Sequence, residues 1–200
     1  MKWLNEDDLG GLYGTPAASS LRKVTDHLTP EYARFVTASR FCVLTTVGPE
    51  GTDGSPRGDD GSVVMILDNR HVALPDWHGN ERIDSIRNIV RDGRCSLLFL
   101  VRGSRNAVRI NGHARLTDDP ELRATFAHQG KLPRSVIVVQ ISEVYFQCAR
   151  AIMRAGLWAG QDDSDGLPTP GQILANLTGG EVGGERYDAE WPVRAAQTLW

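Results

Sequence analysis

The residues best suited to binding chemistry lie in the segment 55–88, where a predicted strand leads into a predicted helix. Backbone N–H groups in the first turn of a helix have no intrahelical partner, so such a junction can hold an anion. Asn80 lies at the junction. Arg82 and Ser85 follow it and provide a guanidinium group and a hydroxyl group. Arg57, on a neighbouring strand, can close the cradle from the other side. This pattern indicates a site for an anionic group.

The same segment also has a purely structural interpretation. Asn80 can cap the predicted helix. Charged residues are common in the first turn of a helix, where they form surface ion pairs; here these would be Glu81, Arg82, Asp84 and Arg87. The residues alone leave both interpretations open.

Signatures of other chemistries are missing from the sequence. It has no phosphate-binding P-loop, no nucleophile elbow and no dinucleotide-binding glycine pattern after a strand. The five histidines never have the i, i+4 spacing of a helical metal pair. We therefore expect no metal site, and we assign no side chain as a catalytic acid or base.

Composition limits the partners and the compartment. Two hundred residues leave room for one domain with an appendage, and a net charge of −3 provides no excess of basic residues for nucleic-acid phosphates. The longest apolar run, Cys95–Val101, is too short to span a bilayer, and the acidic N-terminus lacks the apolar stretch of a secretory signal. We therefore expect a cytoplasmic protein without a nucleic-acid or membrane partner.

The three cysteines support the same compartment. Cys42, Cys95 and Cys148 are far apart in the sequence, form no C-x-x-C pair and lie in apolar runs. An odd number of such thiols is typical of a reducing cytosol. Because free cysteine is among the most buried residue types, we expect all three to be inert core residues.

The hydrophobic pattern predicts a mainly β protein. Six segments have the pattern of strands: 41–47, 62–67, 71–74, 94–101, 107–116 and 135–146. A tight turn is predicted at Asp68-Asn69, and helices are predicted from Pro30 to about Ser39, from Asn80 to Arg91 and after Asp119. Six strands with two or three helices predict a closed or nearly closed antiparallel barrel with helices at its mouth.

The ends of the chain differ from this central region. We divide the sequence into an irregular lead-in at 1–28, a barrel domain at 29–159 and a tail at 160–200 with one short helix, Pro170–Leu177. Trp191 and Trp200 are costly to leave in water, so we expect the tail to wrap over the barrel or its partner and to cover part of the site. A disordered extension is the alternative.

An ordered set of segments, spread over about residues 30–178, resembles one known family. The set comprises 42–46, 55–59, 79–88, 97–100, 108–114, 144–151, 156–158 and 170–174. It is similar to the pyridoxamine 5′-phosphate oxidase-like superfamily of FMN-binding split barrels. The similarity is to FMN-dependent proteins other than the authentic oxidases, because Glu190–Arg194 lacks the downstream histidine and arginine of their substrate-binding segment.

The resemblance implies a six-stranded antiparallel split β-barrel with flanking helices, forming a homodimer with FMN at the subunit interface. The run Val136–Val139, which is apolar on both faces of its strand, adds to the expectation of a dimer. Basic and hydroxyl side chains of the strand–helix junction would hold the phosphate, and Trp158 would either reach the partner's flavin or anchor the core or interface. The implied cofactor-binding residues are Arg57, Asp76, Asn80, Arg82, Ser85, Asn88 and Trp158.

The function implied by the resemblance is that of an FMN-dependent oxidoreductase. Such an enzyme would act on a small-molecule substrate and take electrons from a nicotinamide donor, with hydride transfer at the flavin ring. Two alternatives stay open: a flavin- or haem-binding carrier or sensor without turnover, and a reductase that uses a deazaflavin as cosubstrate.

Overall fold

The computed structural model describes residues 1–79 and 81–200. Seven strands form one antiparallel sheet in the order β2-β1-β5-β6-β7-β4-β3. The strands are β1 (Phe41–Gly48), β2 (Gly51–Gly58), β3 (Met65–Asp68), β4 (His71–Asp76), β5 (Arg94–Leu100), β6 (Ala107–Thr117) and β7 (Ser135–Gln147). This arrangement confirms the predicted mainly antiparallel β fold.

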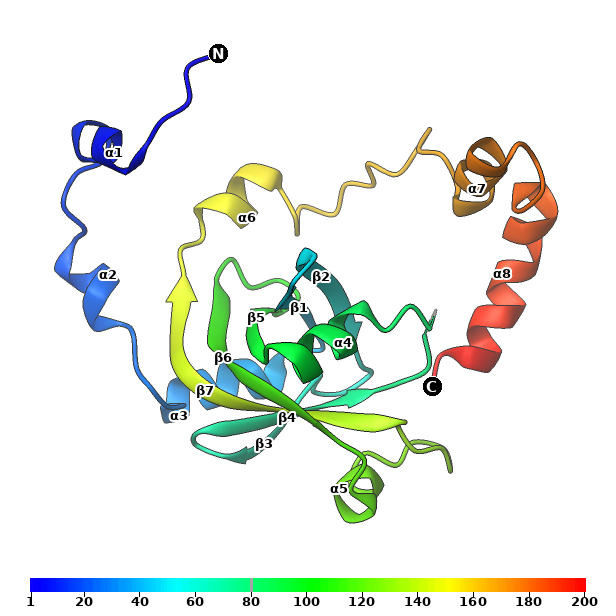
Figure 1. The fold of residues 1–200 in the computed structure, drawn as a ribbon, viewed down its shortest axis with the longest axis horizontal. Coiled ribbons are helices and arrows are strands. Elements are labelled where there is room, and N and C mark those ends of the chain that lie inside the picture. Colours follow the sequence, from blue (N-terminus) through cyan, green and yellow to red (C-terminus); the bar gives the residue numbers. More distant parts are fainter. Residues whose placement is uncertain (80) are drawn as a thin grey trace.

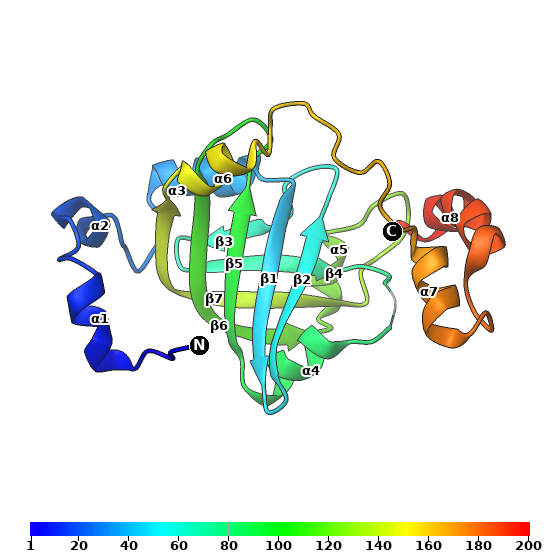
Figure 2. The ribbon, with the colours of Figure 1, turned by 90° about the horizontal axis from the view of Figure 1, so that it is seen from above.

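The sheet curls so that its two halves face each other. In Figure 2, β1, β2 and β5 run across β3 and β4, and the long strands β6 and β7 continue from one layer into the other. The pairing of β6 with β7 shifts register between Asn111 and Gly112. A Cβ atom at Gly112 would lie 2.0 Å from the Gln140 carbonyl oxygen, so only glycine allows this close approach at the bulge.

β2 was not among the six predicted strand segments, although Arg57 within it was expected on a strand. Its sequence is rich in glycine and includes Asp53 and Pro56, which are residue types depleted in strands. β2 is an edge strand that pairs with β1, and Pro56 lies opposite Val43. Proline is tolerated at an edge because its missing N–H can face away from the neighbouring strand. The hairpin turn is also one residue later than predicted, since Asp68 pairs with His71.

Two helices begin where the sequence predicts. In α3 (Pro30–Ala38), Thr29 Oγ1 accepts from the Tyr32 N–H at 3.4 Å. In α5 (Pro120–Ala124), Asp119 Oδ1 accepts from the Leu122 N–H at 2.8 Å. Both helices combine a side-chain N-cap with proline at the first helical position. α4 (Asp84–Arg91) starts four residues later than predicted, because Glu81 (φ 61°) and Ile83 (φ 52°) have left-handed backbones that interrupt a helix.

The two ends of the chain extend from opposite sides of the barrel (Figure 1). Residues 1–28 were expected to be irregular but contain two short helices, α1 (Glu6–Leu12) and α2 (Ala18–Arg22). Neither helix contains a buried residue. After β7 come α6 (Arg150–Ala155), the predicted helix α7 (Pro170–Thr178) and a further helix, α8 (Gly184–Thr198). α8 escaped prediction because paired glycines precede it and Pro192 lies inside it, and both features disfavour a helix.

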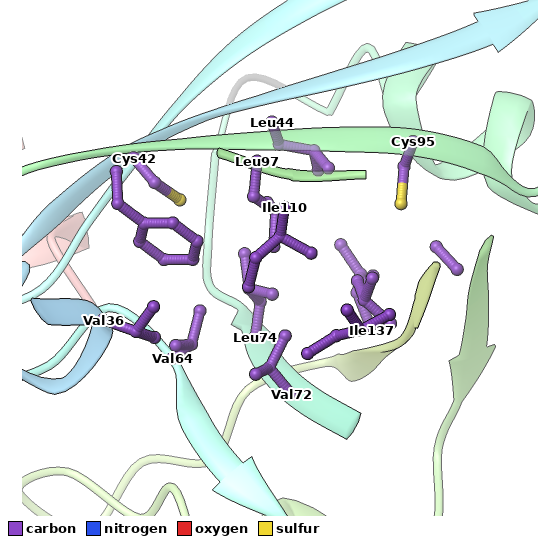
Figure 3. Packing of buried hydrophobic residues seen from close by; sticks show 14 of the residues in the cluster. Val36, Cys42, Leu44, Val64, Val72, Leu74, Cys95, Leu97, Ile110 and Ile137 are labelled. Atoms are coloured by element: carbon purple, nitrogen blue, oxygen red, sulfur yellow. The ribbon is translucent and has the colours of Figure 1, made fainter. Parts of the chain in front are cut away.

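The core lies between the two halves of the sheet and under α3. Its largest fully buried side chains include Leu44, Leu74, Leu97, Phe99 and Ile110. Figure 3 shows how side chains of this core pack against one another.

Val136, Ile137 and Val139 of β7 are also fully buried. Because this single chain already covers the three side chains, the apolar run in β7 carries no argument for a dimer interface. No helix within residues 1–79 or 81–200 is long and apolar enough to cross a membrane.

Two of the three cysteines are core residues, as predicted. Cys42 and Cys95 are buried, and burial raises the pKa of each thiol to about 12. The thiolate is the reactive form, so these two are unreactive at neutral pH. The prediction is wrong for Cys148, which is exposed at the end of β7.

Candidate functional site

A cavity of about 560 Å³ opens where β2, the end of β4 and the start of α4 meet. Its volume is in the range of small-molecule and cofactor sites. Four of the predicted site residues line it: Arg57, Asp76, Arg82 and Ser85. The structure therefore brings together residues from three elements that are separate in the sequence.

Arg57 and Asp76 form an ion pair on one wall of this cavity. Arg57 Nη1 lies 2.8 Å from Asp76 Oδ1, and the side chains are only 19% and 17% exposed. Arg57 Nε is buried, and no residue in the described part of the chain accepts a hydrogen bond from it. A buried N–H without an acceptor costs free energy, which a ligand oxygen would recover. Asp76 therefore orients Arg57, and Arg57 is suited to bind an anion.

The start of α4 forms the opposite wall. Ile83 is the N-cap residue, and it supplies no side-chain hydrogen bond to the first turn. The first-turn residues Asp84, Ser85 and Ile86 all line the cavity. An uncapped helix start carries partial positive charge and favours an anion nearby.

Two predicted phosphate ligands have partners within the protein. Ser85 is buried, and its hydroxyl donates a hydrogen bond to the Asp53 carboxylate of β2. Arg82 Nε donates to Asp84 Oδ2 at 2.9 Å, and the Arg82 side chain is 76% exposed. An incoming anion would have to compete with Asp53 and Asp84 for these donors.

The lining contains more acidic than basic side chains. Its three guanidiniums belong to Arg57, Arg82 and Arg134, and its carboxylates are those of Asp53, Asp59, Asp76, Glu81 and Asp84. Each arginine is paired with one of these carboxylates. Arg57 can bind a phosphate through Nε while Nη1 stays paired with Asp76. Arg82 and Arg134 can contribute only where they turn from their carboxylates toward the ligand.

Two further residues of the lining, Trp77 and Arg134, were not predicted as site residues from the sequence. Trp77 Nε1 donates to Asp59 Oδ2 at 3.3 Å, and burial raises the pKa of Asp59. Arg134 Nη2 lies 2.8 Å from Glu81 Oε1, and this contact lowers the pKa of the Glu81 carboxyl. Trp77 lies within the segment singled out above, whereas nothing in the local sequence relates Arg134 to it.

Asn88 lies on the side of α4 that packs against the sheet. Its side chain is buried, and Nδ2 donates to Thr46 Oγ1 of β1 at 3.1 Å. A Cβ atom at Gly48 would lie 2.0 Å from Asn88 Oδ1, so the amide fits directly over the glycine. Asn88 lines a smaller cavity of about 430 Å³ together with Arg87 and Arg91, and this cavity adjoins the larger one through shared lining residues such as Arg82.

The remaining two predicted residues are Trp158 and Asn80. Trp158 follows α6, and its Nε1 donates to the Ser104 carbonyl oxygen at 2.7 Å in the loop between β5 and β6. It lines neither of the two cavities. Asn80 lies outside the described residues.

Comparisons with known proteins identify the family. Among solved structures, the chain is similar to HupZ of Group A Streptococcus, at 16% sequence identity and a TM-score of 0.48, with 58% of this chain and 91% of HupZ covered. It is also similar to a FAD-binding protein of Mesorhizobium loti, at 16% identity and a TM-score of 0.43, covering 62% and 94% of the two chains. An FMN-binding protein of Syntrophomonas wolfei matches at 13% identity and a TM-score of 0.41, covering 57% and 78%. No curated protein matches the chain significantly.

The family model for pyridoxamine 5′-phosphate oxidase matches residues 28–148. This range begins just before α3 and ends just after β7, so it includes the whole sheet and the cavity between β2, β4 and α4. Because the match spans more than half of the sequence, this protein belongs to the pyridoxamine 5′-phosphate oxidase family.

Proposed function

We propose that this protein binds FMN and uses it as a flavin-dependent oxidoreductase. The observation that carries the proposal is the buried Arg57 Nε, which lacks an acceptor among the described residues and belongs to a cavity bordered by the uncapped start of α4. A phosphate oxygen is a suitable acceptor for it. The family match supports a flavin phosphate as the source of that oxygen.

Arg57 would hold the phosphate, with Asp76 keeping its guanidinium in place. Arg82 and Ser85 would turn from their carboxylate partners to the ligand. Asn80, which the sequence predicts at this junction, would be a further phosphate ligand. When bound, FMN supplies hydride transfer at its ring, and the protein supplies orientation and exclusion of water. The organic substrate would be a small molecule and the electron donor a nicotinamide.

We also propose a homodimer with the flavin at its interface. The outer face of the sheet supports this, because the half-buried side chains of Val43 and Leu98 lie next to each other on β1 and β5. Arg109 and Tyr145 continue this row on β6 and β7. Trp158 would contact the partner's flavin in such a dimer. The three free cysteines support a cytoplasmic location.

The first test compares FMN with riboflavin, which lacks the phosphate. We expect FMN to bind about ten- to a hundredfold more tightly than riboflavin, since a charge-assisted contact to a buried anion contributes roughly 1.5–3 kcal/mol. Most of this difference should disappear in Arg57→Gln. The matched control is Arg115→Gln, because Arg115 is exposed on β6 and lines neither cavity. Equal affinities for FMN and riboflavin in the parent protein would refute the phosphate site.

The second test is the absorbance spectrum and mass of any small molecule that copurifies. A flavin spectrum that bleaches on addition of NAD(P)H supports the oxidoreductase. A flavin that stays oxidised, or a haem Soret band, assigns the protein to the carriers or sensors instead. Binding of a reduced deazaflavin in place of FMN identifies a deazaflavin-dependent reductase.

A further inference from the structure

The end of the tail docks in an aromatic slot beside the cavity. The Trp200 ring meets the Trp77 ring edge-on, with centroids 5.3 Å apart. The Trp200 ring also stacks on the His128 ring, with centroids 4.1 Å apart. Lys131 Nζ fixes the backbone through the carbonyl oxygens of Gln197 and Trp200, at 3.3 and 3.1 Å.

This docking connects the tail directly with the cavity. Leu199, the residue before Trp200, lines the cavity. Trp77 also lines it, and its Nε1 is hydrogen-bonded to Asp59. Leu199 thus forms part of the cavity wall, although it is more than 100 residues from Trp77 in the sequence.

The rest of the tail is organised separately from the barrel. α7 and α8 pack on each other, where Asp188 of α8 accepts hydrogen bonds from Thr169 and from the Gly171 N–H at the start of α7. Residues 160–168 before them are exposed and contain neither helix nor strand. Trp191, on the same helix as Asp188, is 52% exposed. The tail is therefore a small helical unit on an extended connection, with Trp200 as its anchor on the barrel.

We propose that residues 197–200 are a latch that closes the cavity, with Trp200 as the anchor and Leu199 as the cover. Opening requires that Trp200 leave its slot and that Lys131 release the two carbonyl oxygens. The extended connection then lets the α7–α8 unit move without disturbing the sheet. The latch sets how fast a ligand enters and leaves. The identity of that ligand rests on the function proposed above, whereas the latch itself does not.

A cysteine placed in the cavity tests the latch without any flavin. Ser55 lines the cavity, and Ser55→Cys in a Cys148→Ser background introduces one reactive thiol, since Cys42 and Cys95 are buried with raised pKa values. The measured quantity is the rate at which a water-soluble thiol reagent labels position 55. We expect Trp200→Ala to increase this rate about tenfold, because the loss of the aromatic contacts lets residues 197–200 leave the cavity more often.

Trp191→Ala is the matched control, because it removes a tryptophan from α8, the helix before Trp200, without touching the slot. Far-ultraviolet circular dichroism reports the Trp77–Trp200 pair through exciton coupling, which should vanish in Trp200→Ala and persist in Trp191→Ala. The latch is refuted if the coupling is absent from the parent. It is also refuted if Trp200→Ala loses the coupling but labels at the parent rate.

Flavin binding provides a separate readout. If FMN occupies this cavity, Trp200→Ala should increase its association and dissociation rate constants together and change Kd little, because a gate alters access more than affinity. If FMN neither binds nor protects the thiol introduced at position 55 from labelling, the proposed function fails, and the effect of Trp200→Ala on labelling still decides the latch.

Discussion

The two ends of α4 carry similar polar residues but have different surroundings. Near its C-terminal end, Asn88 is buried, donates to Thr46 on β1 and fits over Gly48 without space for another atom. At its start, Ile83 has a left-handed backbone and Arg82 is paired with Asp84 at the surface of a cavity. The first end attaches the helix to the sheet, and the second end exposes groups that a ligand can recruit.

This difference shows which polar residues are available for binding. A buried amide whose donor is already used is expensive to move, since breaking its contact leaves a polar group unsatisfied. An exposed ion pair such as Arg82–Asp84 costs little free energy to break in favour of a ligand contact, because such pairs contribute about 0–1 kcal/mol in water. We therefore expect substitutions near Asn88 to affect folding and substitutions near Arg82 to affect ligand binding.

The largest effect should come from Gly48→Ala. The new Cβ atom would lie 2.0 Å from Asn88 Oδ1, so the amide must move and lose its bond to Thr46. Overpacking and an unsatisfied buried group together should reduce the free energy of unfolding by about 2–4 kcal/mol. Urea denaturation measures the loss. Gly54→Ala on β2 is the control, because a Cβ there meets nothing within 4 Å. Equal stability of the two variants would contradict this account of Asn88.

A smaller effect, on binding alone, is expected for Arg82→Ala. Arg82 lines the larger cavity, but its side chain is largely exposed, so water weakens any contact with phosphate. We expect FMN affinity to fall about three- to tenfold, with an unchanged free energy of unfolding. Arg87→Ala, in α4, which begins just after Arg82, is the control, because Arg87 lines only the smaller cavity. A titration in which both variants lose affinity equally would show that long-range charge, rather than a contact at α4, attracts the ligand.

The smallest effect concerns the residue that ends α4. Arg94 donates to Asp92 and lowers the pKa of its carboxyl to about 2. A carboxyl with a depressed pKa in the folded state stabilises above its ordinary pKa of 3.8, and this contribution is lost as the pH falls toward 2. Asp92→Asn should therefore lower Tm slightly at pH 7, and the difference from the parent should shrink between pH 4 and pH 2. A Tm difference that does not depend on pH would mean that the charge of Asp92 is irrelevant.

Local sequence determined the features that depend on neighbouring residues. Thr29-Pro30, Asp119-Pro120 and Thr169-Pro170 each place a capping side chain before a proline, and each begins a helix in the structure. A run of β-branched and apolar residues predicted β1, along which buried and half-buried positions alternate. These predictions succeed because capping and strand propensity depend mostly on residues that are close in the sequence.

Tertiary structure alone decided the features that depend on distant partners. β2 is a strand because β1 supplies its hydrogen bonds, although its glycines and Pro56 disfavour one. Trp77, Arg134 and Leu199 share one cavity because the sheet curls and α8 returns to it. Arg57 and Asn88 looked alike as polar residues near a strand–helix junction, and only their burial and partners separate a ligand-binding group from a structural one. The free energy of a polar group depends on which atoms surround it, and those atoms are set by the fold.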